Sequence, residues 1–216
     1  MSRKNSAPLK SKFHNIFWDF DGVIHDSLQI KADGFVSLFP EIDIESKKYI
    51  EKYHFENGGV DRFEKIKHFY HKFNGHEITN KKLNRLAENF SDNIKEKIFQ
   101  SKYLIDESVS FIKSNFKNFD FHIVSASEHN ELLKICENFK ISDYFISING
   151  SPGKKADHLR RLIMKFDYQL DESAMIGDSF NDYEASLENN ISFFAFNNPK
   201  LKHLNYLNVI EDLLGK

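Results

Sequence analysis

The stretch NIFWDFDG, residues 15–22, places two carboxylates directly after a short apolar run. We predict a buried strand over residues 15–20, because this segment is short, apolar and aromatic. Side chains alternate along a strand, so Asp19 and Asp21 would point to the same side. They fall where the strand ends, and Gly22 allows an abrupt change of backbone direction just beyond. Two adjacent carboxylates repel each other unless a cation joins them, and Mg²⁺ is the natural candidate because it prefers oxygen ligands.

Length and composition are typical of an intracellular globular protein. The 216 residues suit one sizeable domain, or a core domain with a smaller insertion. The net charge of −2 gives no indication of nucleic acid or an anionic membrane as a partner. No apolar run approaches the roughly 20 residues of a membrane helix, and the polar segment 1–12 is expected to be a frayed tail. The single cysteine, Cys136, favours a reducing cytoplasm, and no oligomeric state is indicated.

Helical periodicity dominates the chain between the first strand and about residue 100. Residues 21–27 are expected to form a turn or flap. Apolar residues then recur at the three- and four-residue spacing of one helix face. The helices predicted from this spacing span residues 31–39, 44–53, 60–73 and 80–99. We predict that residues 28–100 form an inserted helical cap.

Helices and strands alternate in the remainder of the chain. The predicted helices span residues 106–116, 128–139, 155–166 and 181–188, with a last helix over 201–214. The predicted strands span residues 119–125, 144–148, 174–177 and 191–196. Such alternation implies right-handed crossovers and a parallel sheet covered on both faces. We therefore predict an α/β fold whose core, residues 1–27 and 101–216, is a doubly wound, Rossmann-like parallel sheet.

Polar or charged residues follow four successive predicted strands. In chain order they are Asp19 and Asp21, then Ser125 and Ser127, then GSPGKK at 150–155, then GDSFND at 177–182. In an open parallel sheet, ligands bind beyond the carboxyl ends of the strands. Any one of these groups would be a weak signal, but their ordered occurrence predicts a single functional site at that edge.

The same segments resemble the haloacid dehalogenase-like superfamily of phosphohydrolases. The matching positions are DFDGVIHDS at 19–27, Ser125, a lysine within 150–155, and GDSFND at 177–182. The first and last motifs are the most specific. The insertion between the first two motifs resembles the helical cap of the phosphoglycolate phosphatase and β-phosphoglucomutase branch. The resemblance implies a Mg²⁺-dependent phosphatase that acts on a small phosphorylated metabolite.

The resemblance also implies roles for individual residues. Asp19 would be the nucleophile that forms an aspartyl-phosphate, and Asp21 would be the general acid and base. Mg²⁺ would bridge Asp19 and the phosphate, with the Asp21 backbone carbonyl and Asp178 as further ligands. Ser125 would hydrogen-bond a phosphoryl oxygen, and a lysine would neutralise charge on the phosphate.

Either of two adjacent lysines could take this last role, but neighbours on a helix do not share a face. Similar sequences favour Lys155 over Lys154. Asp182 would act through a metal-bound water or orient the lysine. Gly22 and Ala126 are supporting positions within the first two motifs.

Other polar residues have alternative interpretations. Arg62 in the cap could bind a carboxylate or a second phosphate of the substrate, or it could be a solvated helix residue. Ser127 is expected to cap the next helix. Asp26 and Ser27 are expected to cap the first cap helix or to stabilise the flap. His25 is expected to be incidental to catalysis.

Three other functions compete with the phosphatase. A sugar phosphomutase would use the same catalytic motifs, with the cap deciding the acceptor. A C2-haloacid dehalogenase needs neither a metal nor a second acid, so Asp21 argues against it. A non-catalytic binding domain would have lost the nucleophile, the acid or the metal ligand, and all three are present.

Overall fold

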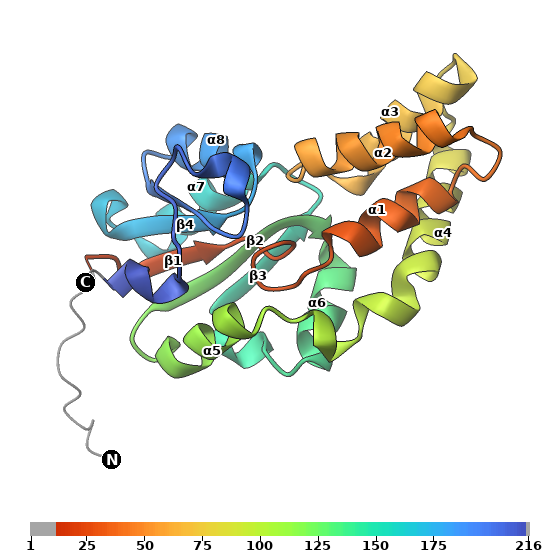
Figure 1. Ribbon diagram of the computed structural model, residues 1–216. Helices are drawn as coiled ribbons and strands as arrows, with labels where there is room; N and C mark the ends of the chain where they lie inside the picture. Colours follow the sequence, from red (N-terminus) through yellow and green to blue (C-terminus); the bar gives the residue numbers. More distant parts are fainter. Residues whose placement is uncertain (1–11, 215–216) are drawn as a thin grey trace.

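The computed structural model describes residues 12–214, and its centre is a parallel sheet of five strands (Figure 1). The strands are β1 (Asn15–Trp18), β2 (Asp120–Glu128), β3 (Ser147–Ser151), β4 (Ser173–Gly177) and β5 (Ser192–Ala195). Their order across the sheet is β3-β2-β1-β4-β5. The predicted parallel α/β sheet is therefore confirmed. Apart from Lys12, the predicted tail lies outside the described residues.

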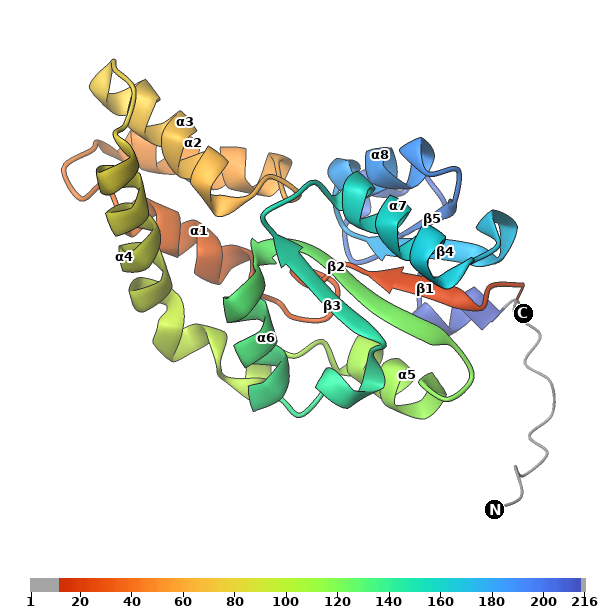
Figure 2. The same cartoon turned by 180° about the vertical axis from the view of Figure 1, so that it is seen from behind.

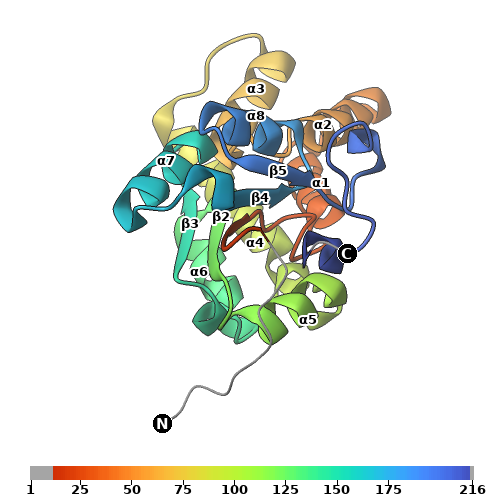
Figure 3. The ribbon, with the colours of Figure 1, turned by 90° about the vertical axis from the view of Figure 1, so that its left-hand side faces the viewer.

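Helices cover both faces of the sheet, as the end-on view shows (Figure 3). The pair α5 (Asp106–Asn115) and α6 (His129–Asn138) lies on one face, and α7 (Lys155–Phe166) and α8 (Phe180–Glu188) lie on the other. The central strand β1 serves both layers because its side chains alternate. Phe17 packs with the α7 and α8 layer, whereas Ile16 and Trp18 belong to the larger apolar core.

The register of β1 sets the position of the site. Trp18, the last residue of β1, pairs with Ile123 of β2 and with Ile176 of β4. The N–H of Asp19 donates to the carbonyl of Ile176 at 2.9 Å. β1 and β4 end within one residue of the same level, whereas β2 continues to Glu128. The residues that follow β1 and β4 therefore meet the last part of β2 at one edge of the sheet.

Four further helices, which we call the cap helices, lie beside the carboxyl ends of the strands (Figures 1 and 2). They are α1 (Leu28–Ser37), α2 (Ile44–Glu56), α3 (Arg62–Asn74) and α4 (Asn80–Ile98). The side chains of Asp43, Asp61 and Thr79 accept hydrogen bonds from the first turns of α2, α3 and α4. Aromatic rings fill the space between these helices, with the centroids of Phe35 and Phe90 4.4 Å apart. The four predicted helices are confirmed, although α1 begins at Leu28 rather than at residue 31.

Strand β3 begins three residues later than the sequence predicts. A short 3₁₀ turn, Ser142–Tyr144, occupies the predicted start. The first bond to the neighbouring strand comes from the N–H of Ile146, which donates to the carbonyl of Phe121 at 2.8 Å. Phe145 of this segment packs in the apolar core before the strand begins, whereas Ile146 is exposed.

The predicted helix over residues 201–214 is wrong. The chain forms two short 3₁₀ segments, Pro199–Leu201 and Ile210–Leu214. Between them, the N–H of Ala195 donates to the carbonyl of Asn205 at 2.7 Å, and the N–H of Leu207 donates to the carbonyl of Ala195 at 2.8 Å. Covering the open edge of β5 in this way competes with helix formation and prevails here. Within residues 12–214, no helix combines the length and apolarity needed to cross a membrane.

Candidate functional site

Three buried aspartates form the centre of the candidate site. Asp19 follows β1, Asp178 follows β4, and Asp182 lies in the first turn of α8. One carboxylate oxygen of each lies within 4.8 Å of the others. Nζ of Lys155, the first residue of α7, lies 2.8 Å from Asp19 and 2.5 Å from Asp182. Lys154 is exposed, so Lys155 is the lysine that reaches this aspartate cluster.

Negative charge exceeds positive charge in the aspartate cluster. Burial, followed by the charge of Asp182, raises the pKa of Asp19 to about 7. Burial and the charge of Asp19 raise the pKa of Asp178 well above its usual range. Burial would lower the pKa of Lys155, but the carboxylates of Asp182 and Asp19 outweigh burial and raise it. Three carboxylates around one ammonium leave room for another cation, and their hard oxygen donors suit Mg²⁺.

Gly22 allows Asp178 to approach the loop that follows β1. Its φ of +80° lies in the left-handed region that favours glycine. A Cβ at this position would lie 2.2 Å from Oδ2 of Asp178. Two asparagines beyond β5 hold the same loops, since Asn197 donates to the carbonyl of Gly22 at 2.9 Å and Asn198 to that of Asp178 at 2.6 Å. The two motifs are thus fixed side by side by hydrogen bonds that the sequence analysis did not anticipate.

The position of Asp182 is fixed within its own helix. Its carboxylate accepts hydrogen bonds from the N–H of Ser179 at 3.1 Å and from its hydroxyl at 2.6 Å. Ser179 in turn caps α8, which completes a capping box. The carboxylate that contacts Lys155 is therefore held in one orientation. This arrangement favours the expectation that Asp182 orients the lysine.

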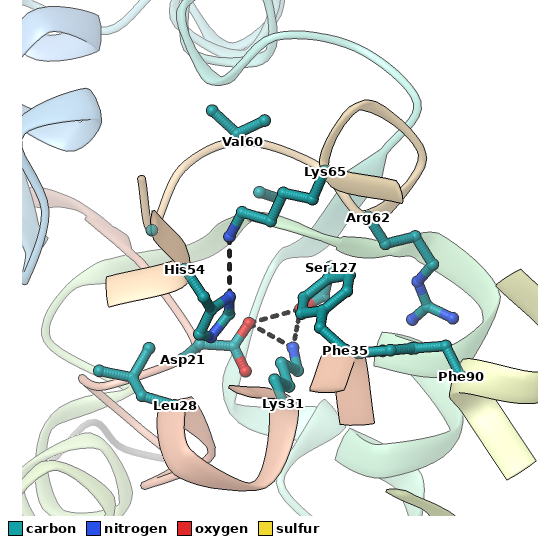
Figure 4. A pocket seen from close by; sticks show the side chains of 12 residues that line it. Asp21, Leu28, Lys31, Phe35, His54, Val60, Arg62, Lys65, Phe90 and Ser127 are labelled. Carbon is teal, nitrogen blue, oxygen red and sulfur yellow. Dashed lines mark hydrogen bonds and ion pairs between the residues drawn. The ribbon is translucent and has the colours of Figure 1, made fainter. Parts of the chain in front are cut away.

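The side chain of Asp21 lines a cavity together with side chains of the cap helices (Figure 4). Nζ of Lys31, from α1, lies 2.5 Å from its Oδ2, and the Ser127 hydroxyl donates to the same oxygen at 2.6 Å. The Ser27 hydroxyl donates to Oδ1. Burial would raise the pKa of Asp21, but Lys31 and the two hydroxyl donors hold it well below its usual range.

Ser127 does not cap the helix that follows it, so that prediction is wrong. Glu128 takes the position, because it accepts hydrogen bonds from the N–H groups of Asn130 at 3.0 Å and Glu131 at 2.8 Å. Ser125 is buried near the end of β2, where its hydroxyl accepts a hydrogen bond from the N–H of Ser127 at 3.1 Å. Because Glu128 caps the helix, the Ser127 hydroxyl is free to donate its hydrogen bond to Asp21.

A small cavity lies between Asp21 and the cap helices (Figure 4). Its volume is about 30 Å³, which is about the space that one water molecule occupies in the liquid. Val60 and Ala126 line this cavity and also a wider one of about 540 Å³, whose wall includes Lys155 and Asn181. The wider cavity reaches Lys155, the residue whose ammonium contacts the aspartate cluster.

Arg62 lies in the wall of the small cavity, but its guanidinium is already paired. Nη1 donates to the Ser91 hydroxyl at 2.5 Å, and Nη2 forms an ion pair with Glu131 of α6. The guanidinium carbon lies 4.9 Å from the ring centroid of Phe90. Arg62 is only 7% exposed, so the interpretation as a solvated helix residue is wrong. Its ion pair joins the cap helices to the core.

Sequence reasoning missed Lys31, His54 and Lys65, which also line the cavity. Helical spacing offered a signal for two of them, because residues three or four apart share a helix face. Lys65 follows Arg62 by one turn of α3, and Lys31 is four residues beyond Ser27. Their roles depend on how the cap helices face the sheet.

His25 belongs to the apolar core and has no contact with the aspartate cluster in the described residues. It is fully buried, and its ring stacks on that of Phe20 at 5.7 Å. Burial lowers its pKa to about 4, so the imidazole is neutral near pH 7. Both ring nitrogens are buried without a hydrogen-bond partner among the described residues, so stacking alone does not explain why a histidine stands here. Its expected absence from the catalytic set stays a prediction.

Comparison with known proteins places this geometry in a family. A sequence profile described as haloacid dehalogenase-like hydrolase matches residues 16–196. No curated protein sequence matches the chain significantly.

Several solved structures share the fold. A predicted phosphatase from Clostridium acetobutylicum has 20% identity and a TM-score of 0.72, covering 94% of this chain and 97% of the other. A predicted phosphoglycolate phosphatase from Haemophilus somnus 129pt has 17% identity and a TM-score of 0.69, covering 94% and 92%. The β-phosphoglucomutase of Clostridium difficile has 18% identity and a TM-score of 0.74, covering 93% of each chain. At these identities the similarity shows the fold alone, whereas the profile match extends over most of the sequence. The chain belongs to the haloacid dehalogenase-like hydrolase family.

Proposed function

We propose that this protein is a Mg²⁺-dependent phosphatase that hydrolyses a small phosphorylated metabolite through an aspartyl-phosphate. One observation carries the proposal. Asp19 lies in a buried cluster with Lys155 and Asp178, while a second carboxylate, Asp21, is held apart by Lys31. One carboxylate is therefore available to attack phosphorus, and another is available to move protons.

Asp19 would act as the nucleophile. One of its oxygens would attack phosphorus, and the bond from phosphorus to the leaving oxygen would break. Lys155, 2.8 Å away, would neutralise charge on Asp19 and on the phosphoryl group. Ser125 would donate a hydrogen bond to a phosphoryl oxygen. The rigid strand ends hold these groups in place, and positioning with electrostatic stabilisation is the main requirement of phosphoryl transfer.

Asp21 would act as general acid and base on the cap side of the phosphoryl group. Because Lys31 and the two hydroxyl donors keep Asp21 ionised in this structure, it would first take up a proton from water when the negative charge of the bound phosphoryl group raises its pKa. It would give this proton to the leaving oxygen and then take one from the water that attacks the aspartyl-phosphate. Lys31, Ser27 and Ser127 hold its two carboxylate oxygens in a fixed orientation. We infer that these three are positioning residues.

The aspartate cluster suits a divalent cation. The raised pKa values of Asp19 and Asp178 indicate that positive charge is deficient at this point. An oxygen of Asp19, the backbone carbonyl of Asp21 and the carboxylate of Asp178 would hold Mg²⁺, together with waters. Bound Mg²⁺ would neutralise charge between the nucleophile and the phosphoryl group. Asp182 would keep Lys155 oriented.

We infer that residues 28–100 act as a cap over a core formed by residues 1–27 and 101–216. A lid of this kind excludes bulk water and limits what the leaving group can be. The wider cavity, whose wall includes Lys155, has a volume of about 540 Å³, which lies in the range of small-molecule sites. We therefore infer a small phosphorylated metabolite rather than a folded phosphoprotein.

The phosphatase proposal is tested with a generic aryl phosphate. We expect phosphate release that depends on Mg²⁺, is lost with EDTA, and returns when Mg²⁺ is added in excess. Asp19→Asn should abolish turnover, whereas Asp26→Asn, a change at an exposed aspartate in the same motif, should leave the rate unchanged. A near-wild-type rate in Asp19→Asn would overturn the nucleophile assignment.

A sugar phosphomutase is the second candidate, because β-phosphoglucomutase shares the fold. It would transfer the phosphoryl group to a second hydroxyl instead of to water. Incubation with α- or β-glucose 1-phosphate separates the two functions. A phosphatase releases free phosphate, whereas a mutase yields the isomeric sugar phosphate.

A further inference from the structure

The cap helices contribute three cationic side chains to the wall of the small cavity: Lys31, Arg62 and Lys65. Lys31 is paired with Asp21, and Arg62 is paired with Glu131. Among the residues that the structure describes, Lys65 forms no ion pair with a carboxylate, and its hydrogen-bond partner is a histidine. The cavity thus contains one cation without a counter-charge.

The surroundings of Lys65 leave much of its ammonium unsatisfied. The residue is only 2% exposed, and its Nζ lies 3.0 Å from Nδ1 of His54 and 5.8 Å from the ring centroid of Phe35. Burial lowers the pKa of His54 well below its usual range, so this ring is neutral and supplies no negative charge. An ammonium has three N–H donors, and two of those on Lys65 find no acceptor within residues 12–214.

Packing alone does not account for a lysine at this position. Burying a charge without a partner, or a donor without an acceptor, costs free energy that an apolar side chain would avoid. The contact with the Phe35 ring is a cation–π interaction and offsets only part of that cost. The unused donors therefore indicate a binding function for the Lys65 ammonium.

Lys65 points into the cavity beside the proposed general acid, as the close-up shows (Figure 4). Burial, followed by the charge of Lys31, lowers the pKa of Lys65 to about 7, while the charges of Asp21 and Asp178 act to raise it. The lysine is therefore within electrostatic range of the site where the phosphoryl group would bind. An anion placed here would supply the missing counter-charge and accept the free donors.

We propose that Lys65 binds a carboxylate on the leaving group, which makes the substrate a small phosphorylated hydroxy acid. The inference rests on the proposed function, because it assumes that the phosphoryl end lies against Asp19. The two oxygens of a carboxylate match the two free N–H donors of Lys65. A cavity of about 30 Å³ favours the planar carboxylate over a bulkier second phosphate. Arg62 does not take this role, because Glu131 already neutralises it.

Binding of non-hydrolysable phosphonates tests the proposal without turnover. Calorimetry on the full chain with Mg²⁺ would compare 3-phosphonopropionate with propylphosphonate, which has the same backbone without the charge. We expect the carboxylate to strengthen binding by about 10- to 100-fold, the range for a charge-assisted hydrogen bond. Propane-1,3-bisphosphonate serves as the third ligand. If it binds more tightly than 3-phosphonopropionate, the assignment of a carboxylate is wrong.

Substitutions on α3 test whether Lys65 is the source of the preference for 3-phosphonopropionate over propylphosphonate. Lys65→Met keeps the length and apolar part of the side chain, and it should bring the ratio of the two affinities to within about threefold. Lys65→Arg keeps a cation and should retain part of the preference. Lys67→Met is the matched control, because Lys67 lies on the same helix but its side chain is 42% exposed and paired with Glu64, and it should leave the ratio unchanged.

The outcomes distinguish this inference from the proposed function. Equal binding of both phosphonates to the wild type, or an undiminished preference in Lys65→Met, would overturn the role of Lys65 while leaving the phosphatase intact. The wild-type comparison decides the question even if a Lys65 variant fails to fold. If neither phosphonate binds and no aryl phosphate is hydrolysed, the proposed function fails and the inference fails with it.

Discussion

Replacing Asp19 with asparagine should stabilise the metal-free protein while it removes activity. The pKa of Asp19 rises from 3.8 to about 7 in the folded state, so the folded protein binds more protons than the unfolded chain between these values. Stability therefore falls as pH rises through this window and levels off above about pH 7. At about 1.4 kcal/mol per pH unit, the ionised carboxylate costs on the order of 4 kcal/mol. Asparagine has a similar shape and cannot ionise, and Lys155 keeps its contact with Asp182.

We expect Asp19→Asn to raise the free energy of unfolding at pH 8 by on the order of 2–4 kcal/mol in the presence of EDTA. The lower bound is 2 kcal/mol because the carboxylates of the wild-type aspartate cluster can share protons, which already reduces the repulsion between them. The assay is equilibrium unfolding in urea at pH 8 and pH 5, with Asp26→Asn as the control. At pH 5 the gain should be less than half of that at pH 8, because the wild-type carboxyl is then mostly protonated.

In excess Mg²⁺ the wild type should become more stable than Asp19→Asn. A ligand at 100 times its dissociation constant stabilises the folded state by about 2.7 kcal/mol, and only the wild type has the complete set of ligands. If Asp19→Asn is neutral or destabilising at pH 8 without metal, the reasoning that the aspartate cluster lacks positive charge is refuted.

Two other structural features give further predictions. Gly22→Ala should lower the free energy of unfolding and the Mg²⁺-dependent activity, because its Cβ would lie 2.2 Å from Asp178 Oδ2. Gly75→Ala has a similar positive φ of 72° and no atom within 4 Å, so it should cost only about 1–2 kcal/mol of backbone strain and leave activity unchanged. Arg62→Met should cost about 3–5 kcal/mol in urea unfolding because it leaves the part-buried Glu131 without its counter-charge and with only the hydrogen bond from Ser91, and adding Glu131→Leu should recover most of the loss. A double variant no more stable than the single one would show that the ion pair is not the cause.

The aspartate cluster could be predicted from the sequence because strand ends determine it. Asp19 and Asp178 each follow a short apolar strand directly, and parallel strands in register bring their carboxyl ends to one edge. Local pattern was sufficient for these two aspartates. The choice of Lys155 over Lys154 came from the resemblance to similar sequences, because the pattern alone did not fix where the helix begins; in the structure α7 begins at Lys155.

The cap side of the site could not be predicted in the same way. Lys31 and Lys65 lie on helices that the apolar spacing predicts, but the spacing does not predict toward which part of the protein each helix face points. Ser127 carries the ordinary signature of a helix cap, and only the position of Glu128 frees it to contact Asp21. The C-terminal segment likewise paired with the edge of β5, a long-range contact that no local spacing reveals.

Identification of the phosphorylated residue tests the central claim most directly. The protein would be quenched in acid during turnover of an aryl phosphate with Mg²⁺, reduced with borohydride, and examined by peptide mass spectrometry. Reduction of an acyl phosphate converts the aspartate that carried it to homoserine. Our account predicts homoserine at position 19 and at no other carboxylate in the chain. Conversion at a different aspartate, or sustained turnover with no conversion at all, would contradict it.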